Sequence, residues 1–280
     1  MEKSNRKWGK ATRLQFIEFR LYWEGKINRG DLVDQFEISV PQASLDIASY
    51  LEAAPGNVEY DKQRKAYFAT ENFEPVLSVP NARDYLSQLE MQRAEDGSPV
   101  SHRSFVGIPP SFDIAQTPER VVNATVFRSI LKAIREKQDL HIEYLSSRAI
   151  WRWISPHAVA SDGFRWHIRA YCHDRNKFID FVFGRILHMG SMRESQVDPT
   201  TDVQWHTMVE LKIAPHPRLN EVQKKGIELD YAMSDGTATL VLREALAPYM
   251  KKRLGLISDI TGTDALQATQ HVCLISERRL

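Results

Sequence analysis

The residues best suited to chemistry lie in the stretch DGFRWHIRAYCHDRNKFIDFVFGRI, from Asp162 to Ile186. Successive side chains of a β-strand point to opposite sides, so this stretch predicts two unlike faces. One face is apolar and consists of Phe164, Trp166, Ile168, Ala170 and Cys172. The other is cationic and aromatic and consists of Arg165, His167, Arg169, Tyr171 and His173. The second face therefore has the residue types that bind an anion.

Arginine supplies most of the positive charge around this stretch. Seven of the eight basic residues between Asp139 and Thr200 are arginines: Arg148, Arg152, Arg165, Arg169, Arg175, Arg185 and Arg193. Arginine binds phosphate through paired hydrogen bonds and stacks on flat rings. Its polar and aromatic neighbours are Tyr144, Ser146, Ser147, His157, Trp166, His167 and Tyr171. This set suits an anionic ligand with a flat part, such as a nucleotide or a short nucleic acid. The alternative is that each arginine pairs with a local acid, such as Asp162 or Asp180, on a solvated face.

The pattern of histidines and cysteines predicts neither a metal nor a cofactor. His141, His167, His173 and His188 share no metal-ligand spacing, and the two cysteines, Cys172 and Cys273, stand far apart. The sequence has no HExxH, P-loop or GxSxG motif. Alternation places Cys172 and His173 on opposite faces, so they do not predict a nucleophile and its base. A nucleic-acid-processing enzyme is therefore only a secondary hypothesis.

The elements around the arginines alternate with period two. Strands are predicted over 139–147, 148–159 and 164–174, and one or two more over 177–192. They are joined by tight turns without helices, which indicates a small antiparallel barrel or a strongly bent sheet. After Pro199 the order becomes strand, helix, strand, helix, strand, which predicts a compact ferredoxin-like α+β unit over 201–280. That unit has no glycine-rich phosphate loop, so its expected role is packing or association.

The N-terminal segment has a different pattern, with helices predicted over 7–25, 28–36 and 39–54 and a hairpin of Val58–Tyr60 and Ala66–Ala69. Trp8 is expected on the buried face of the first helix and Val40 on that of the third. Gly25 ends the first helix, Ser39 caps the third, and Pro55-Gly56 ends the third. Three helices followed by a hairpin are typical of a winged helix-turn-helix, whose third helix enters the major groove of DNA.

The distribution of charge agrees with DNA binding. From Met1 to Arg29 there are eight Lys or Arg residues against three Glu, whereas Asp31 to Ala54 contains no basic residue. Base edges would then be contacted by short polar side chains at the start of the third helix: Ser39, Pro41, Gln42, Ser44 and Asp46. Phosphates would be contacted by flanking cations: Arg13, Arg20, Arg29, Lys62, Arg64 and Lys65. The alternative is a small helical domain with a solvated basic edge.

Length and composition predict a multidomain, soluble, cytoplasmic protein. The chain has 280 residues, of which 42% are hydrophobic and 26% charged. No apolar run is long enough to span a membrane, and the N-terminus does not resemble a secretory signal. Two segments connect the predicted domains: a helix over 81–96, and a turn-rich region followed by a helix over 118–138 with an apolar stripe from Val122 to Ile134. The predicted division is 1–95 for DNA binding, 96–137 as linker and bridging helix, 138–200 for ligand sensing, and 201–280 for association.

The stretch from Gly163 to Ile186 resembles the central motif of the WYL-domain transcriptional regulators, with Trp166-His167-Ile168 at the place of the Trp-Tyr-Leu tripeptide. The flanking Pro156-His157 and Phe183-Gly184-Arg185-Ile186 also match. The resemblance covers essentially the whole chain. The N-terminal part is similar to the regulators of BREX and CBASS anti-phage defence loci, over the stretch FRLYWEGKINRGDLVDQFEISVPQASLDIASYLEAAPGNVEYD.

The resemblance implies a mixed α+β, multidomain fold with an Sm-like β-barrel that senses a nucleotide or nucleic acid. It implies ligand-binding roles for Ser146 or Ser147, His157, Arg169, Arg175 and Arg185, with Tyr144 and Tyr171 as neighbours. It also implies a homodimeric repressor that binds an inverted-repeat operator in double-stranded DNA and uses its C-terminal extension to hold the dimer. An activator of the same architecture is the alternative. The chain departs from the motif at His167, so the ligand preference of the family does not transfer directly.

Overall fold

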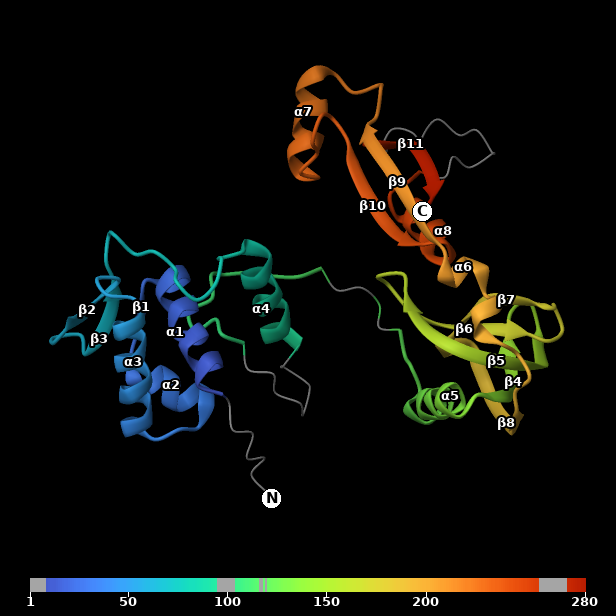
Figure 1. Cartoon of the computed structure of the whole chain (residues 1–280), viewed down its shortest axis with the longest axis horizontal. Helices are drawn as coiled ribbons and strands as arrows, with labels where there is room; N and C mark the ends of the chain where they lie inside the picture. Colours follow the sequence, from blue (N-terminus) through green and yellow to red (C-terminus); the bar gives the residue numbers. More distant parts are fainter. Residues whose placement is uncertain (1–8, 95–103, 116–117, 119, 257–270) are drawn as a thin grey trace. The chain divides into compact units, whose positions relative to one another are not determined.

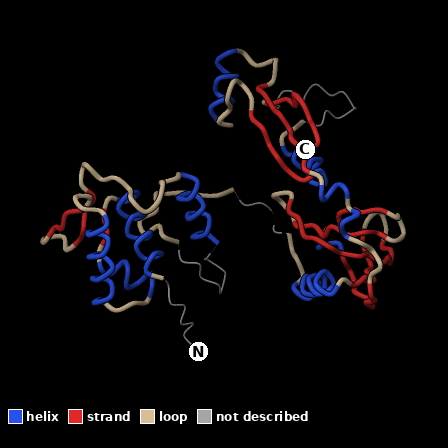
Figure 2. Tube along the Cα trace, viewed as in Figure 1, coloured by secondary structure: helices blue, strands red, loops and turns tan. Residues whose placement is uncertain are grey.

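The computed structural model describes residues 9–94, 104–115, 118, 120–256 and 271–280 (Figure 1). The chain forms two compact units, Met1–Thr117 and Pro118–Leu280. Figure 2 shows that helices dominate the first unit and strands the second, so the fold is mixed α/β. Within the described residues, none of the helices combines the length and hydrophobicity needed to cross a membrane.

The first unit is a winged helix. Its helices are α1 (Lys10–Glu24), α2 (Arg29–Phe36), α3 (Val40–Ala53) and α4 (Ala82–Ala94), and its strands are β1 (Lys26–Ile27), β2 (Val58–Asp61) and β3 (Ala66–Ala69). The strands form an antiparallel sheet in the order β1-β3-β2. The predicted order of helices and hairpin is confirmed. The two-residue strand β1 was not predicted, because so short a strand has no period of its own.

Local signals end and begin these helices as predicted. Gly25 ends α1 in the left-handed conformation at φ 73°, which glycine adopts without a steric penalty. The Ser39 hydroxyl accepts the backbone N–H of Gln42 and caps α3. The buried core combines residues of α1, β1, α2 and α3: Phe16, Ile17, Leu21, Ile27, Leu32, Phe36, Ala43, Ile47 and Tyr50. Val40 was expected in this core but is 56% exposed, because only later turns of α3 reach the core. Trp8 lies outside the described residues.

The second unit contains a five-stranded antiparallel sheet in the order β7-β6-β5-β4-β8. Its strands are β4 (Gln138–Leu145), β5 (Ala149–Ser161), β6 (Trp166–Cys172), β7 (Lys177–Val182) and β8 (Ile186–Glu194), with the turn η2 (Phe183–Arg185) between β7 and β8. Helix α5 (Ala124–Glu136) packs against β4 and β5 and contributes Val126 and Ile130 to their core. This helix, predicted as part of the connecting region, thus has its packing partners in the sheet. Strands β7 and β8 are the two edges, so the described sheet is open and a closed barrel is not confirmed.

The C-terminal part carries a smaller sheet. It comprises η3 (Pro199–Thr201), α6 (Val203–His206), β9 (Met208–Pro215), α7 (Glu221–Asp230), β10 (Ala238–Arg243), η4 (Glu244–Leu246), α8 (Ala247–Arg253) and β11 (Val272–Arg279). The strands pair antiparallel in the order β10-β9-β11, with β9 in the centre. The predicted alternation of strands and helices is confirmed. A ferredoxin-like unit has four strands in a βαββαβ order, whereas the described residues here supply three, so that assignment is not confirmed.

Candidate nucleic-acid interface and ligand site

The start of α3 presents the side chains that were predicted to contact bases. Ser39 and Pro41 are exposed, and Gln42 and Ser44 are partly buried. The Ser44 hydroxyl donates a hydrogen bond to the carbonyl oxygen of Val40 at 3.0 Å. One amide N–H of Gln42 donates to Oδ1 of Asp46 at 3.1 Å, which fixes the rotamer of the glutamine. The helix therefore offers Gln42 in a held orientation, which suits bidentate contact with adenine.

Asp46 and Arg13 have a structural role that the sequence did not reveal. Asp46 is only 1% exposed, and its carboxylate accepts Nε of Arg13 at 2.6 Å and Nη2 at 3.1 Å. This bidentate pair joins α3 to α1, so Asp46 is not among the exposed base-contacting residues. The Arg13 side chain is 12% exposed and directed at Asp46, and its role as a phosphate contact stays a prediction. Arg20 is likewise buried and pairs with Glu24 at 2.7 Å.

The remaining predicted phosphate contacts are exposed. Lys62, Arg64 and Lys65 lie in the turn between β2 and β3, where the Arg64 side chain is 72% exposed. Arg29 is exposed at the start of α2, and its Nη2 donates to the hydroxyl of Tyr67 in β3 at 3.3 Å. These four exposed cations therefore belong to the wing and to α2, while α3 itself carries none.

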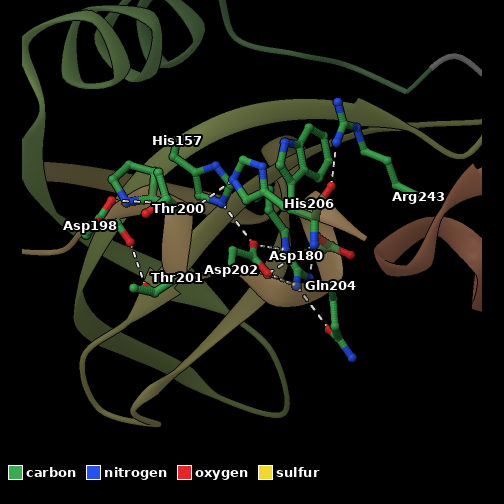
Figure 3. Close-up of polar contacts among 12 residues, drawn as sticks. His157, Asp180, Asp198, Thr200, Thr201, Asp202, Gln204, His206 and Arg243 are labelled. Carbon is green, nitrogen blue, oxygen red and sulfur yellow. Dashed lines mark hydrogen bonds and ion pairs between the residues drawn. The ribbon is translucent and has the colours of Figure 1, made fainter. Parts of the chain in front are cut away.

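A buried ionic centre lies in the second unit and contains two of the predicted ligand residues (Figure 3). Arg169 of β6 is 3% exposed, and it donates to Asp202 through Nε at 2.7 Å and Nη2 at 2.9 Å. His157 of β5 places Nε2 2.9 Å from Oδ2 of the same aspartate. Asp180 of β7 and Gln204 of α6 also accept hydrogen bonds from Arg169, at 3.2 and 3.0 Å. Asp202 is thus the residue that joins His157 to Arg169.

Strand geometry explains how these side chains meet. Arg169 and Asp180 are directly paired residues on β6 and β7, so their side chains lie on the same face. The register of β5 and β6 shifts between Pro156 and Ala158, which makes His157 the extra residue of a β-bulge. Proline lacks a ladder donor and is found at bulges, and a bulge redirects the neighbouring side chain. Asp202 also caps α6, where it accepts the backbone N–H of Trp205.

The charges of this centre oppose anion binding in the described arrangement. Burial lowers the pKa of His157, and this effect outweighs the opposite influence of Asp202, so the imidazole is neutral at neutral pH. Burial alone would raise the pKa of Asp202. The hydrogen bonds and charge of Arg169 outweigh this effect and hold the pKa below its ordinary value. The centre therefore holds one cation and the two carboxylates of Asp180 and Asp202. An anion that binds Arg169 would have to compete with the carboxylates of Asp180 and Asp202.

The cavity beside His157 is small. It has a volume of about 110 Å³, and Ser155, His157, Phe178 and Pro199 are among the residues that line it. Pockets for ligands of nucleotide size measure roughly 300–1,000 Å³. The cavity as it stands is therefore smaller than a typical nucleotide site.

The other residues of the WYL-like motif occupy different environments. His167 is 2% exposed, lies 3.1 Å from Asp162 and stacks at a tilt on Tyr249 of α8, with 4.9 Å between ring centroids. Ile168, Ala170 and Cys172 are in the core as predicted. Phe164 and Trp166, predicted on the same apolar face, are 58% and 54% exposed, because they lie at the hairpin end beyond the core.

The remaining predicted ligand residues do not join the buried centre. Tyr144 is in the core, and its hydroxyl accepts the backbone N–H of Val182. Tyr171 is half-buried, with its hydroxyl donating to Asn176 at 3.4 Å. Four residues are exposed in turns: Ser146, Ser147, Arg175 and Arg185. Sequence reasoning missed Asp202, Gln204 and Tyr249. For Asp202, the one available signal was its position as a helix N-cap, which does not predict an ion pair.

A second polar cluster resembles a catalytic triad but lacks its proton arrangement. Ser155 is buried, donates its hydroxyl proton to Asp139, and lies 2.9 Å from Nε2 of His173. A serine has one such proton, so His173 must donate to the serine oxygen. A catalytic histidine has to accept the serine proton. The cluster, completed by Arg193 on Asp139, therefore has the geometry of a structural network. Among the described residues, no group of three His, Cys, Asp or Glu side chains could hold a metal ion.

Comparison with known proteins defines the class to which this fold and these surfaces belong. Three family models match successive parts of the chain: the BrxR transcriptional regulator winged helix-turn-helix domain at 9–91, the WYL domain at 125–190, and the BrxR transcriptional regulator C-terminal dimerization domain at 208–280. The chain is thus built as a winged-helix regulator with a WYL domain and a dimerisation domain.

Proteins similar to the whole chain identify the family more narrowly. The chain is 39% identical to the DNA-binding transcriptional repressor CapW of Stenotrophomonas maltophilia, over 95% of this chain and 89% of that protein. It is 37% identical to CapW of Escherichia coli (strain KTE188), over 94% and 87%, and 39% identical to CapW of Pseudomonas aeruginosa, over 90% and 85%. The chain belongs to the WYL-domain transcriptional regulator family, in the group of BrxR and CapW, and this family is one of non-enzymatic regulators.

Among solved structures, the chain is similar to proteasome accessory factor B/C (PafBC) of Arthrobacter aurescens at 16% identity. That alignment covers 92% of this chain and 45% of the other, with a TM-score of 0.29. The family assignment does not depend on this similarity.

Proposed function

We propose that this protein is a homodimeric transcriptional repressor that binds an inverted-repeat operator in double-stranded DNA. The observation that carries the proposal is the combination of a held Gln42 on α3 with exposed cations on the wing and α2. Two α3 helices of a dimer would occupy successive major grooves, about one DNA turn or a multiple apart. Arg29, Lys62, Arg64 and Lys65 would contact phosphates, and Ser39, Pro41, Gln42 and Ser44 would face the bases.

We assign DNA binding to residues 1–95, connection to 96–137, ligand sensing to 138–200 and dimerisation to 201–280. The sensing sheet would correspond to an Sm-like small barrel, since a helix precedes five antiparallel strands. We also propose a ferredoxin-like fold for the C-terminal part, because its strands and helices alternate. The repressed genes would be an anti-phage defence locus, as the likeness to BREX and CBASS regulators suggests, and the protein would act in the cytoplasm, where operator DNA lies.

We further propose that an anionic nucleotide or nucleic acid relieves repression by competing with Asp202 for Arg169 and His157. Asp202 lies in the segment that leads into β9, the central strand of the smaller sheet. Tyr249 of α8 donates to Asp180 at 2.9 Å, so the same ionic centre contacts two segments of the C-terminal part. A ligand that binds better when Asp202 is displaced would favour a different arrangement of these segments. Exposed Arg175 and Arg185, which lie before and after β7, would also contact the ligand.

The test of operator binding uses the DNA upstream of the gene in a mobility-shift titration. Changing Gln42 and Ser44 together to Ala should cost about 1–3 kcal/mol of binding free energy for each half-site that loses a base contact, or about 2–6 kcal/mol for the dimer. Ser39 is left intact because it caps α3. The matched control changes exposed Ser191 and Gln196 of the second unit to Ala and should bind as the wild type does. Wild-type affinity in the Gln42/Ser44 variant would remove α3 from the interface.

The test of ligand relief titrates the operator complex with nucleotides, cyclic oligonucleotides and short single-stranded DNA. An active compound releases the DNA from the wild type, while Arg175→Ala with Arg185→Ala binds the operator but no longer responds. These exposed arginines make a cleaner test than Arg169, whose removal leaves Asp180 and Asp202 buried together. Release of the variant at the same concentration as the wild type would discard these arginines as ligand contacts.

A further inference from the structure

The solvent-facing side of α3 is apolar at its centre. At 3.6 residues per turn, positions 41, 45, 48 and 52 fall within roughly 60° of one another. All four are exposed, and three of them are apolar: Pro41, Leu45 and Ala48. Leu45 is 63% exposed, which is more than Val40 on the same helix. The polar Gln42 and Ser44 flank this apolar strip on either side.

This strip does not contribute to the fold of its own unit. The opposite side of α3 supplies the core residues Ala43, Ile47 and Tyr50, which are all at most 2% exposed. Burial of a leucine stabilises a protein by about 1.5–3 kcal/mol, and Leu45 forgoes most of that stabilisation. An exposed leucine at the centre of a helix face is instead a candidate contact for a partner.

The charges around the strip identify the class of partner. The same unit carries exposed cations on α2, Arg29, and on the wing, Lys62, Arg64 and Lys65. The carboxylate that contacts Gln42, that of Asp46, is neutralised by Arg13. A surface whose exposed cations come from α2 and the wing, and not from α3 itself, matches a duplex, in which phosphates border the groove and bases form its floor. The apolar group that the major groove offers on that floor is the C5-methyl of thymine.

We propose that Leu45, flanked by Pro41 and Ala48, determines operator specificity by packing against a thymine methyl group. This inference rests on the proposed function, because it requires α3 to lie in the major groove. Gln42 and Leu45 are three residues apart and therefore neighbours on one helix surface. Adenine contact by Gln42 and methyl contact by Leu45 would thus select neighbouring A·T base pairs.

The test replaces thymidine by deoxyuridine, which removes the methyl group and leaves base pairing intact. The operator is first located by footprinting, and each thymidine of a half-site is then exchanged singly. Loss of one buried methyl should weaken wild-type binding about fourfold per half-site. Leu45→Ala should weaken binding to the thymidine operator and be insensitive to the exchange. Its fold should persist, because the side chain is exposed and alanine favours helices.

Leu86→Ala is the matched control, since Leu86 is 58% exposed on α4 of the same unit. It should retain both the affinity and the methyl sensitivity of the wild type. Wild-type binding that is insensitive to every exchange, or a Leu45→Ala variant that remains fully sensitive, would overturn the methyl contact. If Leu45→Ala lost affinity on both operators alike with no methyl sensitivity in the wild type, Leu45 would contact the DNA at a group other than a thymine methyl, and the proposal would again be overturned. Failure of the wild type to bind any upstream DNA would instead overturn the proposed function itself.

Discussion

The ionic centre around Asp202 leads to a quantitative prediction for Asp202→Asn. The change removes the charge that meets Arg169 at 2.7 and 2.9 Å, but asparagine still caps α6. Breaking a buried pair costs about 3–5 kcal/mol, because the remaining charge is left uncompensated. Asp180 and Gln204 still accept from Arg169, so the lower end of that range, about 3 kcal/mol, is expected.

Urea unfolding of the full-length protein, followed by tryptophan fluorescence and circular dichroism, measures this loss. Lys132→Ala is the control, because Lys132 and Glu136 form an exposed pair with side chains 52% and 47% accessible. Its effect should stay below about 0.5 kcal/mol. If Asp202→Asn lost less than about 1 kcal/mol, water would be solvating Arg169, and the assignment of a buried, uncompensated charge in the variant would be wrong.

Two further predictions concern salt and pH. Changing Lys62, Arg64 and Lys65 together to Ala should make the plot of log affinity against log salt less steep. The slope should fall by about 0.9 for each phosphate that the variant no longer neutralises. An unchanged slope would exclude the wing from the DNA interface. For His157, burial lowers the pKa in the folded state below its ordinary value of 6.5. At a pH between the folded-state and unfolded-state pKa values of His157, the unfolded chain binds more protons than the folded chain. The contribution of His157 to stability is therefore complete above pH 6.5 and is lost as the pH falls through the folded-state pKa. The urea midpoint should therefore drop between about pH 7.5 and 5.5 in the wild type and drop less in His157→Gln. Equal drops in the two proteins would show that groups other than His157 cause the pH dependence.

Local patterns in the sequence were sufficient for the elements and for one surface. Helix periodicity, the cap at Ser39 and the stop at Gly25 depend on neighbours within a few residues, so the winged helix could be predicted from them. The exposed cations of the wing follow from the same logic, since a turn between two short strands places its residues in solvent. Alternation also placed Ile168, Ala170 and Cys172 in the core.

Partners that are distant along the chain were decided only by the tertiary structure. Arg13 and Arg169 looked alike in the sequence, as cations available to an anionic ligand, yet each is held by a carboxylate 33 residues away. Periodicity shows on which face a side chain lies, but not which segment covers that face. Asp46 lies in α3 and Asp202 is the N-cap of α6, and packing brings them to these arginines because a guanidinium withdrawn from water requires a compensating charge. The sequence by itself thus determined where positive charge is concentrated, and the tertiary structure decided which of those charges remain available to DNA or a ligand.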